Sequence, residues 1–434
     1  MPGYAGAKGR LGTDPRPPPR PAGNRGERDV LTRSQQQHTV AACFLSWTLD
    51  AFDFFIMVFV LADIAKEFDT GMTAVTIAIT LTLAARPLGA LLFGYMADRI
   101  GRRRVLILNV LIFTAFEFVS GLAPSLVTFI VIRALFGVAM GGEWGVGASL
   151  TMESIPAKWR GMASGFLQAG YPCGYLLASL LYWIAFSAVG WRALFMIGAI
   201  PGLFVAGYIF FYVQESPDWL QRKTHAKIGT WEAISSNWQL MIYAILIMTA
   251  INFYAHGTQD LYPSALLRVQ HGFSVSTVSK IAIVYSVGAI LGCILVASLS
   301  QKIGRRRAIV GSALLSILVI PVWAFSDNPV YLGIGAFFMQ FLVQGCFGVV
   351  PAHLNELSPP AIRGMFPGFV YQFGNFLAAG NATIQSLIAD RMNHDYSVAL
   401  AVVPFVGAIV IAGLVCMGRE GRDVKMGGEA TPAQ

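Results

Sequence analysis

Long runs of apolar residues alternate with short polar segments along most of the chain. The runs are about twenty residues long, the length that an α-helix needs to cross the ~30 Å hydrocarbon core of a bilayer. We expect twelve such helices from residue 39 onward. Their predicted spans are 39–62, 72–96, 105–123, 125–149, 161–188, 192–213, 239–262, 276–299, 308–325, 330–353, 365–389 and 397–417. The pattern therefore predicts an all-α integral membrane protein with twelve transmembrane helices.

Polar segments divide these helices into two groups. Residues 1–38 are rich in Pro, Gly and Arg and have too few apolar residues to build a core, so we expect a disordered cytosolic tail. Residues 214–238 form a cytosolic linker, with a six-helix bundle at 39–213 before it and a second at 239–417 after it. A short cytosolic tail follows at 418–434.

Composition and charge narrow the class of protein further. The chain is 55% hydrophobic and only 12% charged, whereas soluble domains are roughly one-quarter charged, so a water-soluble globule is excluded. The net charge of +8 does not indicate a nucleic-acid partner, because the basic residues lie in short runs between the predicted helices. The predicted outer segments contain few of the 31 Lys and Arg: Lys66, Arg192, Arg268, Lys280 and Arg391. The positive-inside rule then places both termini in the cytosol of a plasma membrane, or of the inner membrane in a bacterium.

Two stretches of the first half recur in the second half. Residues 101–104 (GRRR) match 304–307, and residues 153–161 (ESIPAKWRG) match 356–364 (ELSPPAIRG). Both matches have an offset of 203 residues, which indicates an internal duplication. Parallel six-helix repeats are typical of secondary transporters, whose substrate site lies at mid-membrane between the halves.

Ionisable side chains inside the spans are candidates for function, because each costs about 2.5–3.5 kcal/mol at a helix centre unless it faces a cavity or a partner. Asp50 and Asp53 share one face of the first helix, and the offset of 203 makes His256 the equivalent of Asp53. A carboxyl in a partly dry cavity can load and release a proton, so Asp50 or Asp53 is the predicted proton-coupling site. The proton is the only coupling ion that we expect, with no cofactor and no metal.

The seventh helix presents several polar groups on one face. Asn252, His256 and Asp260 recur at intervals of four residues, and Gln259 lies three beyond His256. A protonated His256 could bind a substrate carboxylate, with Asn252, Gln259 and Asp260 as further contacts. The alternative is a structural network, or capping of the outer helix end by Gln259 and Asp260. Tyr371 and Asn375 on the eleventh helix are additional candidates for substrate binding.

The arginines inside the spans have more than one interpretation. Arg133 suits bidentate capture of a substrate carboxylate, but it could also neutralise Asp50 or Asp53. An Asp–Arg pair that opens when substrate binds would combine the two roles. We expect Arg86 to be a structural or gating residue, for which Glu143 is a candidate partner. Glu117 is expected to pair with another helix.

Gating is also expected at two equivalent loops. The pairs Glu153/Arg160 and Glu356/Arg363 could bridge the loops when the cytosolic side is shut, although exposed pairs are often worth less than ~1 kcal/mol.

Several of these motifs resemble those of the major facilitator superfamily. Residues 94–104 (GYMADRIGRRR) are similar to its loop signature between helices 2 and 3, and residues 133–141 (RALFGVAMG) to its helix 4 signature. The resemblance implies gating roles for Asp98 and Arg102. The second copy has Gln301 in place of Asp98, so a charge latch should be asymmetric.

A narrower resemblance rests on three segments. Residues 47–55 (WTLDAFDFF), 141–145 (GGEWG) and 252–260 (NFYAHGTQD) resemble the sialate/lactate proton symporters, and the third is similar to the signature of yeast-type lactate permeases. It differs from that signature at Ala255 and Ser264. The resemblance implies proton-coupled uptake of short monocarboxylates.

The resulting hypothesis is a proton-coupled symporter of lactate or pyruvate that works by alternating access as a monomer in the lipid bilayer. Its rivals are a transporter of a larger organic anion such as sialate, an uncoupled facilitator and a nonconducting sensor. An enzyme is not expected, because the sequence contains no persuasive nucleophile, metal cluster or phosphate-binding loop.

Overall fold

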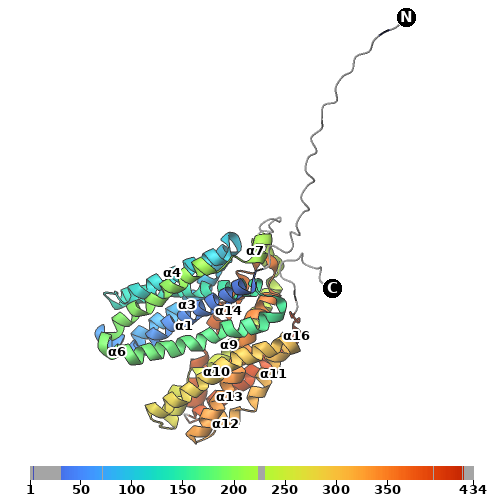
Figure 1. The fold of residues 1–434 in the computed structure, drawn as a ribbon. Coiled ribbons are helices and arrows are strands. Elements are labelled where there is room, and N and C mark those ends of the chain that lie inside the picture. The colour runs from blue at the N-terminus through green and yellow to red at the C-terminus, as the bar shows by residue number, and fades with distance from the viewer. Residues whose placement is uncertain are drawn as a thin grey trace.

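The computed structural model describes Gly3 and residues 31–70, 72–222, 230–393, 395–422 and 424. Within these residues the secondary structure is helical, and the helices form two bundles that lie side by side (Figure 1). The N-terminal end of α1 and the C-terminal end of α16 lie at one end of the bundles, which we call the termini side. Most of the predicted N-terminal tail, residues 223–229 of the linker and most of the predicted C-terminal tail lie outside the described residues.

The first bundle contains five long helices. They are α1 (Arg33–Phe59), α3 (Met72–Ile100), α4 (Arg102–Ser120), α5 (Leu126–Ser154) and α6 (Arg160–Tyr212). The short helices α2 (Leu61–Glu67), η1 (Ala157–Trp159), α7 (Pro217–Arg222) and α8 (Thr230–Ser236) connect or follow them. The first helix starts at Arg33, earlier than the predicted residue 39, because Thr32 and Gln35 form a capping box that stabilises an extra turn and a half.

The second bundle repeats this arrangement with more interruptions. Its helices are α9 (Trp238–Gln259), η2 (Tyr262–Gln270), α10 (Val275–Ile303), α11 (Arg305–Ile317), α12 (Ile320–Ala324), α13 (Pro329–Leu357), η3 (Pro360–Ile362), α14 (Phe366–Ala378), α15 (Asn381–Arg391) and α16 (Tyr396–Met417). Two predicted spans, 308–325 and 365–389, are therefore each divided into two helices.

The described residues account for twelve membrane crossings. Eight helical segments are long and apolar enough to span a membrane by themselves. One of them includes α6, whose 53 residues contain Gly190 in a non-helical conformation with φ of 74°. The non-helical backbone at Gly190 divides α6 into two crossings. Glycine suits this position because a side chain would be strained at such a φ. The pairs α11/α12 and α14/α15 and the arginine-rich α4 supply the remaining crossings.

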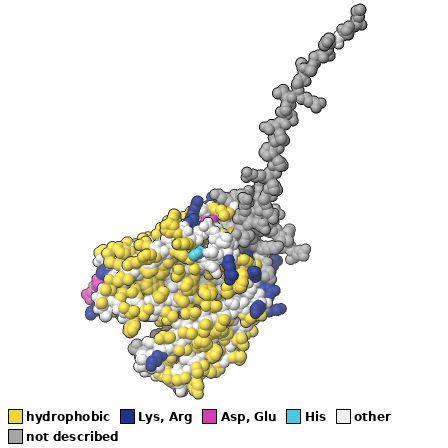
Figure 2. All heavy atoms as spheres, in the orientation of Figure 1, with side chains coloured by type: hydrophobic (Ala, Val, Ile, Leu, Met, Phe, Trp, Pro, Cys, Tyr) yellow, Lys and Arg dark blue, Asp and Glu magenta, His cyan; other side chains and the backbone are white. Residues whose placement is uncertain are grey.

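The duplication is visible in the helix bounds. Helices α3, α4 and α5 begin at residues 72, 102 and 126, and α10, α11 and α13 begin at 275, 305 and 329. Each pair is separated by the predicted offset of 203 residues. Figure 2 shows hydrophobic side chains over most of the visible face, as expected for a surface in contact with lipid. The predicted fold class, two pseudo-symmetric six-helix bundles in a membrane, is confirmed.

The two bundles touch closely near the termini side. A Cβ added to Gly145 in α5 would lie 2.5 Å from the Cα of Gly368 in α14, so only glycine fits there. The Ser149 hydroxyl donates to the Arg363 carbonyl at 2.8 Å, and the Ser164 hydroxyl donates to the Gly348 carbonyl at 2.5 Å. These contacts shut the space between the bundles at this end.

Candidate functional site

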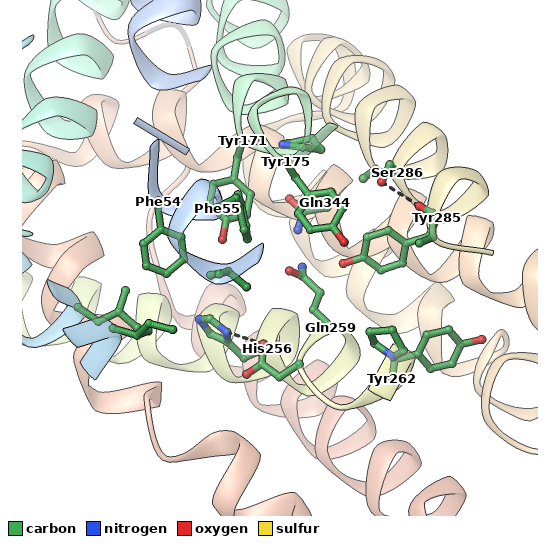
Figure 3. Close-up of a pocket in the computed structure, with 18 of the residues that line it drawn as sticks. Phe54, Phe55, Tyr171, Tyr175, His256, Gln259, Tyr262, Tyr285, Ser286 and Gln344 are labelled. Carbon is green, nitrogen blue, oxygen red and sulfur yellow. Dashed lines mark hydrogen bonds and ion pairs between the residues drawn. The ribbon is translucent and has the colours of Figure 1, made fainter. Parts of the chain in front are cut away.

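A cavity of about 550 Å³ lies between the two bundles, further from the termini side than the glycine contact (Figure 3). Both bundles contribute to it: the first through α1, α3 and α6, and the second through α9, η2, α10, α13 and α14. The side chains that give it its chemical character are Phe54, Phe55, Thr80, Tyr171, Tyr175, His256, Gln259, Asp260, Tyr262, Tyr285, Ser286, Gln344, Asn375 and Phe376. Aromatic walls with a few polar groups are typical of a small-molecule site.

His256 is at the centre of a polar group on the cavity wall that also contains Asp260 and Asn375. Its Nδ1 lies 3.1 Å from Asp260 Oδ1, and its Nε2 lies 2.8 Å from Asn375 Oδ1. Oxygen atoms on both sides of the ring suit an imidazolium, in which both ring nitrogens donate. The side chains of His256 and Asp260 are 31% and 34% exposed, so both remain accessible from the cavity. The structure thus brings together three residues that the sequence proposed separately.

Gln259 also faces the cavity (Figure 3). Its Nε2 lies 3.5 Å from Gln340 Oε1, and Gln340 in turn donates to the Thr258 hydroxyl at 3.0 Å. The amide of Gln259 therefore joins α9 to α13 weakly and keeps hydrogen-bonding capacity for a ligand.

Three predicted substrate-binding residues do not line the cavity: Asn252, Tyr371 and Arg133, which is described below. Asn252 is buried in α9, and its Nδ2 has no hydrogen-bond partner among the described residues. Tyr371 stacks on Trp144 with ring centroids 4.2 Å apart and an angle of 19° between the planes. Because Trp144 is in α5 and Tyr371 in α14, this stack joins the bundles one helical turn closer to the termini side than Asn375. Tyr371 is thus part of the closed contact between the bundles.

The candidate proton-coupling residues lie inside the first bundle. Asp50 and Asp53 are buried, and neither oxygen of Asp50 nor Oδ1 of Asp53 has a hydrogen-bond partner among the described residues. The nearest charged groups to Asp53 include Arg133, Glu117 and Asp50. Burying a carboxylate without donors costs far more free energy than burying a protonated carboxyl in the same place.

Arg133 does not line the cavity in this conformation. Its Nη1 lies 2.6 Å from Glu117 Oε2, and its guanidinium lies 3.9 Å from the ring centroid of Phe136. Its Nε and Nη2 have no partner among the described residues. Arg133 therefore pairs with Glu117 and retains free donors beside the Asp50 and Asp53 carboxyls, which fits the interpretation of a charge partner inside the bundle.

The expected pair of Arg86 and Glu143 is not formed. Both side chains belong to the described part of the chain and are buried, yet no ion pair joins them. Arg86 Nη2 lies 2.7 Å from the Met140 sulfur, and its guanidinium lies 5.2 Å from the Phe54 ring centroid. Neither oxygen of Glu143 has a hydrogen-bond partner in the described structure. The prediction was wrong because Met140, one turn before Glu143 on α5, is the residue that meets Arg86.

Asp98 and Arg102 lie where the two bundles meet at the termini side. Asp98 accepts the N–H groups of Gly364 at 2.8 Å and Met365 at 3.1 Å, just before α14 begins. Arg102 donates to Asp98 at 2.7 Å and to Glu153 at 3.1 Å. A carboxylate at a helix N-terminus interacts favourably with the N–H groups and the helix dipole, so Asp98 holds the two bundles together in this conformation.

The second repeat contains the same contacts with a neutral side chain. Gln301 Oε1 accepts the N–H of Gly161 at 3.1 Å, one residue after α6 begins, and Arg305 donates to Gln301 and to Glu356. The latch is asymmetric in charge, as the replacement of Asp98 by Gln301 predicted.

The proposed loop pairs are different from those observed. Glu153 pairs with Arg102, and Glu356 pairs with Arg305 at 2.9 Å. Arg160 instead donates to the Met152 and Val424 carbonyls at 3.1 and 2.6 Å. Arg363 lies 3.6 Å from Asp218. The prediction paired charges that are near in sequence. The fold instead places the buried arginine that begins α4 or α11 beside each glutamate.

Glu420 lies after the last membrane span and holds the chain end against α11. Partial burial disfavours its charge, but hydrogen bonds from the backbone N–H groups of Arg305, Arg306 and Arg422 outweigh burial and lower the pKa of Glu420. Glu215 caps α4 with similar contacts, because it accepts the N–H groups of Arg102 and Arg103 at 2.9 and 3.1 Å. Each repeat thus has a glutamate that caps the helix after its arginine-rich loop.

The aromatic lining was missed by the sequence argument. Tyr171 and Tyr175 are one turn apart on α6, and Phe55 packs edge-on against both, with centroids 5.4 and 4.9 Å away. Tyr285 lines the opposite wall from α10. The spacing of Tyr171 and Tyr175 was a usable signal, but aromatic residues in an apolar helix equally suit lipid contact, and only the packing shows which side they face.

Two bundles related by an internal repeat, with a cavity between them, define the class of secondary membrane transporters. The family model described as "Major Facilitator Superfamily" matches residues 43–383 and 257–426. The chain belongs to the major facilitator superfamily.

Three relatives have names that refer to the transport of a carboxylic acid, a muconolactone or sialic acid. The chain is 25% identical to the "Carboxylic acid transporter protein homolog" of Saccharomyces cerevisiae over 86% of its own length and 66% of that protein. It is 29% identical to the "Probable 4-methylmuconolactone transporter" of Cupriavidus pinatubonensis, covering 80% of this chain and 82% of that protein. The "Sialic acid transporter NanX" of Escherichia coli is 27% identical, covering 87% and 93%.

The fold also matches a solved transporter structure. The proton:xylose symporter XylE, bound to 6-bromo-6-deoxy-D-glucose, superposes with a TM-score of 0.75 and 17% identity over 91% of this chain and 98% of that chain. At that identity the likeness concerns the fold.

Proposed function

We propose that the protein is a proton-coupled symporter of organic monocarboxylates that works by alternating access. The observation that carries the proposal is the polar group of His256, Asp260 and Asn375 on the wall of a cavity shared by both bundles. An imidazolium held between two oxygen atoms can bind a carboxylate when the substrate competes with Asp260. The organic-acid transporters among the relatives support the same substrate class.

Proton coupling is proposed from the buried carboxyls of the first bundle. Asp50 and Asp53 have oxygens without donors in this conformation, so they favour the protonated state here and release the proton when rocking of the bundles brings water or a guanidinium to them. Arg133 is the available guanidinium, with two donor nitrogens unused.

Lactate and pyruvate are the first substrates to test, and a larger organic acid is the second. A cavity of about 550 Å³ with aromatic walls is in the range that holds drug-sized ligands. This volume favours a cyclic or unsaturated acid over a three-carbon acid.

The test is uptake of labelled acids into proteoliposomes with an inward proton gradient, repeated after a protonophore has collapsed the gradient. Lactate, pyruvate, nicotinate and sialate would be compared, with xylose as a neutral solute. We expect accumulation of at least one acid that disappears with the gradient. Equilibration without accumulation would indicate a facilitator, and absence of uptake of every acid would overturn the proposal.

A matched pair of histidine variants tests the assigned site. His256→Ala should reduce acid uptake at least tenfold at unchanged expression, because it removes the cationic group in the cavity. His271→Ala is the control: this histidine stacks on Phe273 and does not line the cavity. Normal uptake by the His256 variant would remove His256 from the mechanism.

A further inference from the structure

A second hollow lies on the outer surface of the protein, away from the transport cavity. It has a volume of about 640 Å³ and runs between α3, α8 and the residue before α14. Its lining residues are Leu88, Leu91, Leu92, Tyr95, Arg99, Trp231, Ile234 and Met365. The proposed function gives no role to this groove.

The groove changes in chemistry along α3. Leu88 and Leu92 are 64% and 50% exposed and form its apolar part, and Arg99 forms its polar end. At 1.5 Å per residue, Leu88 and Arg99 are ~16 Å apart along the helix axis. Half of a ~30 Å hydrocarbon core is ~15 Å, so the groove has the length of one leaflet.

The polar end carries a cation that lacks an acidic partner. The Arg99 guanidinium lies 4.7 Å from the ring centroid of Tyr95, and no hydrogen bond or ion pair joins it to the part of the chain that the structure describes. The neighbouring Asp98 carboxylate already accepts from Arg102, Gly364 and Met365. Trp231 on α8 also lines the groove and is 80% exposed. Exposed Tyr and Trp are typical of the headgroup level of a bilayer.

The groove also crosses the boundary between the bundles. Met365 belongs to the second bundle, and the other lining residues belong to α3 and to the linker helix α8. A Cβ on Gly94 would lie 2.5 Å from the Cα of Met365, so the two bundles are in contact at this point. A ligand in the groove would touch both bundles only while the termini side is closed.

We propose that an anionic phospholipid of the leaflet at the termini side binds in this groove and stabilises the closed conformation. Its phosphate pairs with Arg99, and one acyl chain lies along Leu88, Leu92 and Met365. The Arg99 cation, which has no acidic partner among the described residues, favours an anionic lipid over a zwitterionic one.

Native mass spectrometry of the purified full-length protein tests this proposal. The protein would be titrated with phosphatidylglycerol, with phosphatidylcholine and with glycerol phosphate, and the bound fraction would be measured for each. We expect phosphatidylglycerol to bind, and Arg99→Gln to weaken its binding at least threefold. Arg99→Lys should retain most of the binding, because it keeps the charge.

The control is Arg391→Gln, which removes an exposed arginine from α15, outside the groove. It should bind phosphatidylglycerol like the unmodified protein. Equal binding by Arg99→Gln would overturn the proposal, and so would equal binding of phosphatidylcholine. Binding of glycerol phosphate with the same affinity would identify a phosphate site that needs no acyl chain, which also contradicts it. Thermal unfolding curves recorded without lipid would verify that every variant is folded.

Discussion

His256 has an oxygen acceptor at each ring nitrogen, one from its own helix and one from α14. An oxygen atom on each side of the ring suits a protonated His256. In the proposed mechanism, a substrate carboxylate competes with Asp260 for one N–H, which links binding to a change in the contacts of α9.

The first prediction concerns Asn375, which orients His256 from α14. Asn375→Ala removes the acceptor at Nε2, and the loss of one hydrogen bond to a charged group is worth about 1.5–3 kcal/mol. We expect the KM for the transported acid to rise about tenfold or more, with a smaller change in the maximal rate. Initial uptake rates over a range of substrate concentrations would measure this. Asn237→Ala is the control, because Asn237 precedes α9, does not line the cavity and donates its amide to the Ala233 carbonyl in α8.

The second prediction concerns Glu420, whose pKa is lowered by three backbone N–H donors despite its partial burial. A lowered folded-state pKa means that the charged form stabilises the folded protein above the usual glutamate value of about 4.5. This stabilisation is lost as the pH falls through the lowered value. The protein should therefore unfold at a higher temperature than Glu420→Gln at pH 7, and the difference should shrink below pH 4.5. A constant difference across this range would contradict the assignment.

Helix ends, rather than helix middles, connect the two bundles at the termini side. Asp98 and Gln301 occupy equivalent places before α4 and α11. Asp98 accepts two N–H groups before α14, and Gln301 accepts one near the start of α6. The two latches therefore differ in charge and in the number of N–H groups that they accept.

The third prediction follows from this difference. Gln301→Glu would place a carboxylate between the Gly161 N–H and the Arg305 guanidinium, and charge-assisted hydrogen bonds are roughly twice as strong as neutral ones. We expect the closed termini side to be stabilised and the maximal transport rate to fall severalfold. Asp98→Asn should instead weaken the closed state. Counterflow rates of both variants at saturating substrate would test this, and equal rates would contradict it.

The fourth prediction concerns the contact of α5 with α14. Gly145→Val would insert a Cβ 2.5 Å from the Cα of Gly368, and the backbone atoms there cannot yield as a flexible side chain would. The bundles should then stay apart at the termini side, with transport abolished. Gly413→Val in α16 is the control, because no atom lies within 4 Å of an added Cβ there. Thiol labelling of a cysteine introduced at Ser149 would report the opening, and unchanged labelling would contradict it.

The whole molecule is closed at the termini side and contains its cavity further from that side. The candidate proton-coupling residues lie in one bundle, while the His256 group lies in the other. In the proposed mechanism, proton coupling passes through the relative motion of the bundles.

The fifth prediction tests this coupling. Asp53→Asn removes a titratable group that is buried in the first bundle and does not line the cavity. We expect gradient-driven accumulation to fall at least tenfold while exchange of internal for external substrate continues, since exchange needs no net proton movement. Asp327→Asn is the control, because its side chain is fully exposed. Loss of both accumulation and exchange would assign Asp53 a role in binding or folding instead.

Much of the fold was predictable, because spans of apolar residues and the offset of 203 are properties of the sequence itself. The breaks at Gly190, between α11 and α12 and between α14 and α15 were not assigned, since local hydropathy does not report backbone conformation. His256, Asp260 and Asn375 were named as separate candidates, but their mutual distances depend on how α9 packs against α14.

The sequence by itself determined the membrane class, the two repeats and the candidate residues, because burial in lipid dictates composition and helix length over every span. Only the tertiary structure decided which charges pair. Arg133 meets Glu117, Arg86 meets Met140, and Glu153 and Glu356 meet Arg102 and Arg305. Pairs between different helices depend on the rotation and register of each helix within the bundle. Side-chain packing sets both, and the periodicity along one helix does not encode them.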